Sequence, residues 1–209
     1  MMNMRIIGDV HGNAEDYIEL IAEEKYSIQI GDMGFSQTYE KLMDYVPASH
    51  HRFVPGNHDD YDNLPPHALG DWGIYEIDGF SAFFVRGADS PDKDFRLIEK
   101  TKTKIKSWWD CEELTASQGE QALVDYVDAQ PDFMITHDCP TFLTATMGST
   151  WPPTHTQELL QRMYEEWQPK HWIFGHWHQD KVIADDGTTF ICLSQLSHAD
   201  FDCETQSFV

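Results

Sequence analysis

Asn57, His58 and Asp59 follow a β-like segment in the run FVPGNHDD at positions 53 to 60. The Pro-Gly pair ahead of them favours a turn, and Asn tolerates left-handed backbone angles. The three polar side chains also offer a neutral oxygen, a titratable imidazole and a carboxylate, a set that metal chemistry can use. Taken alone, the run is compatible with either interpretation.

Two further pairs have a spacing suited to ligand binding. Asp9 and His11 lie two residues apart, and this spacing puts both side chains on one face of an extended backbone. His176 and His178 repeat that spacing with two imidazoles. A polar loop and a pair of surface histidines are the alternatives for these two motifs.

Two single residues extend the pattern. Asp32 lies between Gly31 and Gly34, where glycines allow backbone to approach a ligand closely. A carboxylate has two oxygens and can bridge two cations. His137 follows the strand-like segment that ends in MIT, although a lone histidine can also be an ordinary core or loop residue.

Together the blocks provide seven donors of intermediate or hard character, which suit Mn, Fe, Zn or Ni better than Ca. The seven are Asp9, His11, Asp32, Asn57, His137, His176 and His178.

Five β-like segments must position these donors, because each donor block comes at the end of one. The segments are MRIIGDVHG, YSIQIGDMG, HRFVPGNHD, PDFMITHDCP and HWIFGHWH. Helical periodicity covers residues 156–167, with Thr156 as N-cap, and Ser117 and Glu120 have the spacing of a capping box. Weaker helices follow Asn13 and Ser36. The alternation predicts an α/β layer fold whose loops gather at one sheet edge.

The remaining segments predict antiparallel strands and long loops. Residues 72–86 and 181–195 have Asp-Gly turns between alternating segments, so we expect hairpins and mixed sheets. Residues 87–111 and 140–155 are polar or rich in Pro and Gly and are interpreted as long loops, which are often binding loops. No linker divides the 209 residues, so we expect a single domain over residues 1–209.

The charge balance limits the partners. The chain has 14 Lys and Arg residues against 36 Asp and Glu residues, a net charge of −22. Nucleic acid and anionic membranes both need a basic footprint and are disfavoured, whereas a small phosphorylated substrate beside a pair of cations is not. The four cysteines are scattered and form no CxxC pair. We see no leader and no apolar run near roughly 18 residues, and we therefore expect a cytoplasmic protein with reduced thiols. The oligomeric state stays open.

In their order along the chain, the blocks Asp9-Val-His11, Gly31-Asp32, Gly56-Asn57-His58-Asp59, His137 and Gly175-His176-Trp-His178 resemble the calcineurin-like metallophosphoesterase superfamily, in particular its small bacterial and phage-type members. The resemblance implies a four-layer α/β/β/α sandwich of two mixed β-sheets with a dinuclear metal site at the strand C-terminal ends. Matching positions assign Asp9, His11, Asp32 and His178 to one divalent ion, and Asp32, Asn57, His137 and His176 to the other. Mn is the first choice, with Fe, Zn and Ni as alternatives.

The same resemblance assigns a catalytic role to His58, as proton donor to the leaving oxygen or as a transition-state stabiliser, with Asp59 orienting it. The implied activity is metal-dependent hydrolysis of phosphomonoesters or small phosphodiesters, through in-line attack of a hydroxide that bridges two cations roughly 3.5–4 Å apart. A nuclease with the same metal centre and a non-catalytic interaction module on the same fold are the alternatives. The small number of Lys and Arg residues argues against the nuclease. The complete ligand set with His58 argues against the non-catalytic interaction module.

Several positions depart from the family pattern. The second block reads GDMGFSQ, with Phe35 where many relatives have a second acid and with no Arg after it, and the third reads GNHD instead of GNHE. Both departures argue against a protein Ser/Thr phosphatase. Arg86 and Arg96 could grip phosphate in place of the missing Arg, or could pair with neighbouring carboxylates. Trp108 and Trp109 could stack on a nucleobase or pack within the protein.

Overall fold

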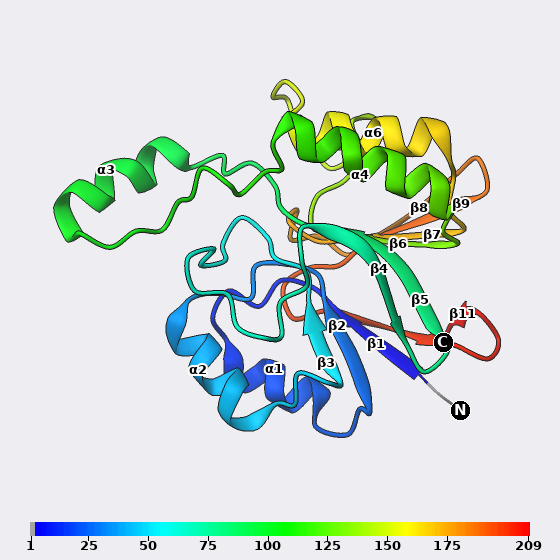
Figure 1. The fold of residues 1–209 in the computed structure, drawn as a ribbon, viewed down its shortest axis with the longest axis horizontal. Coiled ribbons are helices and arrows are strands. Elements are labelled where there is room, and N and C mark those ends of the chain that lie inside the picture. Colours follow the sequence, from blue (N-terminus) through cyan, green and yellow to red (C-terminus); the bar gives the residue numbers. More distant parts are fainter. Residues whose placement is uncertain (1–2) are drawn as a thin grey trace.

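The computed structural model of the chain describes residues 3–209 and consists of two β-sheets packed face to face, with helices on the outer faces (Figure 1). The first sheet has the strand order β11-β10-β1-β2-β3. Its strands are β1 (Asn3–Ile7), β2 (Tyr26–Gln29), β3 (His51–Phe53), β10 (His198–Asp202) and β11 (Ser207–Phe208). β1, β2 and β3 run parallel, and β10 pairs with β1 in the antiparallel direction.

The second sheet has the order β4-β5-β6-β7-β9-β8. Its strands are β4 (Trp72–Ile77), β5 (Phe80–Val85), β6 (Phe133–Thr136), β7 (His171–Phe174), β8 (Lys181–Asp185) and β9 (Thr188–Cys192). The four central strands are parallel, and the β4-β5 and β8-β9 hairpins add antiparallel edges. The predicted mixed sheets and hairpins are therefore confirmed.

Helices complete the four layers. α1 (Ala14–Ile21) and α2 (Ser36–Tyr45) cover the first sheet, and α4 (Ala116–Ala129) and α6 (His155–Glu166) cover the second (Figure 1). α5 (Thr141–Thr144) is a single turn beside α6. The α/β/β/α sandwich implied by the family resemblance is confirmed. No helix within residues 3–209 is long and apolar enough to cross a membrane.

Strand periodicity explains the layers. Met4 and Ile6 of β1 belong to the core between the two sheets, whereas Ile7 belongs to the cluster under α1 and α2. Alternate side chains of a strand point to opposite faces, so a sheet that is buried on both faces needs apolar residues at nearly every position. A third cluster, which includes Tyr126 and Trp172, lies between the second sheet and α4 and α6.

Two helix starts differ from the prediction. α4 is capped by Thr115, which exchanges hydrogen bonds with Gln118, and α6 is capped by Thr154, which does the same with Gln157. The expected caps at Ser117 and Thr156 are therefore wrong by two residues. The apolar stripe on which the prediction depended begins inside each helix, while a Thr-x-x-Gln capping box sets the true start.

The predicted loop over residues 87–111 is also wrong, because it contains α3 (Lys93–Thr103), and the loop over 140–155 contains α5. α3 extends away from the two sheets (Figure 1), and Arg96 is its one buried residue. Helical periodicity is weak in such a segment because there is no core for an apolar stripe to face. We call residues 93–106, which comprise α3 and the turn after it, the arm.

Candidate metal centre

The five predicted donor blocks lie at the C-terminal ends of β1, β2 and β3 in one sheet and of β6 and β7 in the other. Parallel strands deliver their C-terminal residues to the same edge, and the packing of the two sheets brings the two edges together. The side chains form two groups in which the potential ligand atoms all lie within 4.8 Å of one another: Asp9, His11 and His178 in one, and Asp32, His137 and His176 in the other.

Asp32 lies between the two groups. Its Oδ1 is 3.2 Å from Nε2 of His137, and its Oδ2 is 3.6 Å from Nε2 of His11. Asn57 joins the second group, with its Oδ1 3.1 Å from Nε2 of His137. In the first group, Asp9 Oδ2 is 3.0 Å from Nε2 of His178. The structure thus gathers all seven predicted ligands around two adjacent points.

The backbone at the site is held in unusual conformations. Four of the predicted ligands have left-handed φ angles: His11 (48°), Asp32 (59°), His176 (66°) and His178 (50°). Each such residue costs about 1–3 kcal/mol, and strain of this kind concentrates at functional sites. Glycines permit the close packing: a Cβ at Gly31, where φ is +114°, would collide with the imidazole of His137. A Cβ at Gly56 would collide with the carboxylate of Asp32.

The electrostatics of the site fit cations. Asp9 and Asp32 are buried, and Asp9 Oδ2 receives no well-aligned hydrogen bond, with two imidazole nitrogens as its nearest polar neighbours. Burial would raise the pKa of Asp9, but the imidazoles of His11 and His178 lower it to about 2. Burial would lower the pKa of His137, but Asp32 and then Asp9 raise it to about 10. Two buried carboxylates need positive charge nearby, which divalent ions can supply.

His58 lies at the mouth of the centre. Its backbone N–H donates to Asp32 Oδ1 over 2.7 Å, and its ring centroid is 5.0 Å from that of His11. The side chain also comes within ligand distance of His11 and Asp32, so its position alone allows either a catalytic or a ligand role. Burial lowers the pKa of His58 to about 4, against the charge of Asp32 and with the help of Arg96.

Arg96 is the residue that contacts the imidazole of His58. Its Nη2 is 3.0 Å from Nδ1 of His58 and also touches Nε2. The guanidinium is held in turn by Asp92, at 2.7 Å, and by the carbonyl oxygens of Asn57 and Ser107. The arm is thereby connected to the candidate catalytic histidine through a buried side chain.

The hydrogen bonds of Asp59 give its predicted role in orienting His58 no support. The Asp59 carboxylate accepts hydrogen bonds from the backbone N–H groups of Asp32 (3.0 Å), Gly34 (3.1 Å) and Gly56 (2.7 Å), and from Tyr39 Oη (3.0 Å). Burial, followed by the charge of Asp32, raises the pKa of Asp59 to about 7. Asp59 therefore fixes the second and third donor loops to one another, because its carboxylate accepts hydrogen bonds from both.

The structure separates the two arginines. Arg86 forms an ion pair with Asp71 (2.5 Å), donates to the carbonyl oxygen of Cys111 (2.6 Å) and lies over the ring of Tyr61. These contacts match the alternative of carboxylate pairing and give the phosphate-binding prediction for Arg86 no support. Arg96, in contrast, lies at the centre.

The two tryptophans both have partners within the protein, so their contacts favour packing. Trp109 is buried and stacks on Phe35, and Trp108 lies under Lys93.

Sequence reasoning missed the residues that support the donors from behind. Asn57 Nδ2 donates to Ser90 Oγ (3.2 Å), and Ser90 Oγ donates to a carboxylate oxygen of Glu112. This series of hydrogen bonds orients Oδ1 of Asn57 toward Nε2 of His137. Tyr39 supports Asp59 in the same way. No motif marks these residues, because their partners are brought close only by the fold.

A hollow of about 500 Å³ opens beside the two groups. It is lined by His11, Gly12, Gly34, Phe35, Ser36, Gln37, Thr38, Lys41 and His58. Phe35, at the position where many relatives have a second acid, forms a partly exposed wall of this hollow. The departure from the family pattern therefore makes the space beside the metal centre less acidic and more apolar.

Two mixed sheets with clustered His and Asp side chains at their joined C-terminal edges define an α/β sandwich built around a candidate dinuclear metal centre. The family model of calcineurin-like phosphoesterases matches residues 2–180, and the chain belongs to this family. Among the curated proteins, none matches the chain in sequence.

Solved structures agree with this fold. Protein TT1561 of Thermus thermophilus superposes with a TM-score of 0.58 at 11% identity, over 100% of this chain and 97% of that chain. GAP50 of Plasmodium, described as the anchor in the inner membrane complex, gives 0.54 at 12% identity, over 96% and 81%. The phosphopantetheinyl hydrolase PptH of Mycobacterium tuberculosis gives 0.50 at 12% identity, over 92% and 89%. At these identities the likeness concerns the fold.

Proposed function

We propose that this protein is a metal-dependent hydrolase of phosphate esters that acts on phosphomonoesters or small phosphodiesters. The observation that carries the proposal is the position of Asp32, which directs one carboxylate oxygen toward each of the two ligand groups. A carboxylate shared in this way is the arrangement that a two-metal site requires. Family membership supports the same class of reaction.

Seven side chains would hold the ions: Asp9, His11 and His178 on one side, Asn57, His137 and His176 on the other, and Asp32 between them. Two divalent ions at these positions would supply a nucleophilic water at neutral pH and neutralise charge that develops at phosphorus. Mn is our first choice, with Fe, Zn and Ni as alternatives, because imidazole and carboxylate ligands suit these metals.

His58 acts on the leaving oxygen in this proposal. It borders both the ligand groups and the hollow, so a phosphate at the centre with its leaving group in the hollow lies next to the imidazole. Arg96 Nη2 contacts both ring nitrogens of His58 and so holds the ring beside the centre, and the neutral imidazole has one N–H that it can donate. Arg96 thus acts as a positioning residue, because it contacts His58 while Asp92 and the carbonyl oxygens of Asn57 and Ser107 hold its guanidinium in place.

We also propose a cytoplasmic location, which the four free cysteines support because reduced thiols are typical of that compartment.

Removal and return of metal test the proposed activity. Protein treated with a chelator should lose hydrolysis of an aryl phosphate monoester or diester and regain it with Mn²⁺. Arg86→Met is a matched control, because Arg86 has no contact with the ligand groups. Absence of cleavage of both ester classes with Mn, Fe, Zn and Ni, in protein shown to bind the metal, would contradict the proposal.

A further inference from the structure

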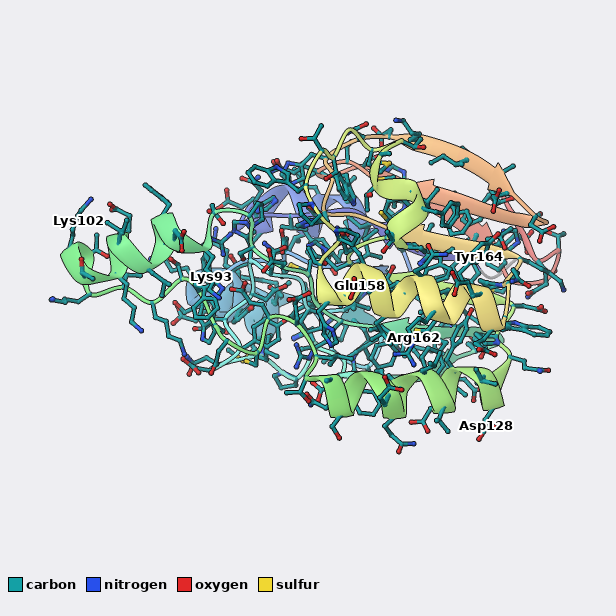
Figure 2. The ribbon with its side chains drawn as sticks, turned by 90° about the horizontal axis from the view of Figure 1, so that it is seen from above. Lys93, Lys102, Asp128, Glu158, Arg162 and Tyr164 are labelled. Carbon is teal, nitrogen blue, oxygen red and sulfur yellow. The ribbon has the colours of Figure 1, made fainter. Side chains whose placement is uncertain are left out.

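Positive charge is concentrated in the arm. Residues 93–106 contain six of the 14 Lys and Arg residues and only two acids, Asp94 and Glu99, so the arm carries a net charge of +4. The whole chain carries −22, which leaves −26 for the rest. Figure 2 shows Lys93 and Lys102 on the extended helix, well away from α4 and α6. The arm is therefore a basic element on an acidic protein.

Large apolar side chains on the arm lack a cover. Phe95 is 63% exposed, Ile98 53% and Ile105 69%. Phe95 and Ile98 are three residues apart and share a helix face with Lys102, four residues further along. This face, defined by Phe95, Ile98 and Lys102, is the arm face. Exposed apolar residues surrounded by charge are typical of an interaction surface.

α2 has a face of complementary character. Glu40, Met43 and Asp44 have the i, i+3, i+4 spacing that places them on one side of the helix, and all three are exposed. Met43 is 54% exposed. We call these three residues the α2 face. Its surroundings on α1 are also acidic, with exposed Glu15, Asp16 and Glu19.

We propose that the arm of one molecule docks on the α2 face of a second copy of this chain, and that two such contacts form a symmetric dimer. Phe95 and Ile98 of the arm would pack on Met43 in the middle of the contact. The lysines of the arm would surround them and face Glu40 and Asp44. The arm and α2 lie on the same side of the molecule (Figure 1). One two-fold axis can therefore form both contacts at once.

Charge also selects the partner. Two arms, at +4 each, repel one another, so the arm binds the acidic body of a second copy and not its arm. An anionic membrane or a nucleic acid would attract the arm but repel the remaining −26. The acidic body of a second copy adds the same long-range repulsion, but it also offers the exposed Met43 between Glu40 and Asp44 as an apolar contact. The exposed Phe95 and Ile98 further favour a protein surface over a phosphate backbone.

Charge reversal and mixing test the dimer. Wild-type protein should sediment as a dimer at low salt, with a dissociation constant that rises with NaCl concentration. Lys100→Glu with Lys102→Glu on the arm, and separately Glu40→Lys with Asp44→Lys on α2, should each raise that constant by at least about tenfold. An equimolar mixture of the two variants should form dimers again, because one contact is then native and the other has both charges exchanged.

A matched control is Lys25→Glu with Lys170→Glu. These lysines precede β2 and β7, at the sheet edge away from the metal centre, and the change in net charge equals that of the arm variant. The control should stay dimeric. A wild type that is monomeric at every salt concentration, variants that dimerise as well as the wild type, or a mixture that stays monomeric would each overturn the proposal. So would a monomer whose arm binds phosphatidylserine vesicles or a single-stranded oligonucleotide.

Discussion

The metal centre and the arm differ in how the chain holds their side chains. At the centre, the donors follow directly from buried strands, with left-handed backbone at Asp32 and with Gly31 and Gly56 in contact with neighbouring ligands. The side chains of the arm are exposed or half-buried, with the exception of Arg96, which is buried. The sheets therefore preorganise the centre, whereas the arm reaches it through Arg96, which contacts the imidazole of His58 and the carbonyl oxygen of Asn57.

The largest effect should come from the shared carboxylate. Asp32→Ala should remove metal from the protein and reduce hydrolysis by at least about a thousandfold, because both ligand groups lose a member. Metal content per chain and the hydrolysis rate, measured on the same sample, check this. Retention of metal by the variant would show that the two groups do not depend on Asp32.

His58→Ala should separate catalysis from ligation. We expect metal content to stay at the wild-type level while kcat falls about 10²–10⁴-fold, the range for loss of a general acid or base. The same two measurements apply. Loss of metal equal to that of Asp32→Ala would mean that His58 is a ligand, as its distance to His11 and Asp32 allows.

The donors could be predicted from the sequence because a strand fixes where its C-terminal residues go. Asp9, Asp32, Asn57, His137 and His176 each follow a strand of a parallel set, so local pattern and sheet geometry agree. The class of fold followed from the same alternation. These predictions needed no knowledge of which residues lie side by side across the sheets.

Contacts between segments could not be predicted. Two of the partners of Asp59 are the backbone N–H groups of Asp32 and Gly34 in the loop after β2, and their distance in sequence hides them. Arg96 reaches His58 from 38 residues away, from a helix without a core-facing apolar stripe. Helix starts at Thr115 and Thr154 were missed because the capping box precedes the apolar pattern.

A smaller effect should follow from breaking the contact between Arg96 on the arm and His58 at the centre. Arg96→Met should lower kcat by about ten- to a hundredfold without loss of metal, because His58 loses the group that positions it. Arg96→Lys should restore part of the rate, and Arg86→Met should leave kcat near the wild-type value. An unchanged kcat in Arg96→Met would show that the arm does not affect catalysis.

The smallest effect concerns Glu112. Its carboxylate accepts a hydrogen bond from Ser90, the residue that supports Asn57, and lies 3.9 Å from Nη1 of Arg96 on the arm. Burial raises the pKa of this carboxyl from 4.5 to about 7. The folded state therefore binds the proton more tightly than the unfolded state, and this group reduces stability as pH rises from about 5 to above 7. In Glu112→Gln that loss should be smaller by about 1–2 kcal/mol. Urea unfolding at pH 5 and pH 8 checks it, and equal pH dependence in both proteins would contradict the burial argument.

In the proposed function, Asp32 joins two metal positions into one catalytic centre. Titration of metal-free protein with Mn²⁺, followed by native mass spectrometry and by hydrolysis of an aryl phosphate ester in the same samples, tests it most directly. We predict that hydrolysis rises with the population that holds two ions per chain. The Asp32→Ala variant should show neither hydrolysis nor a population with two ions. Full hydrolysis by a population with one ion, or by the metal-free protein, would contradict this role of Asp32.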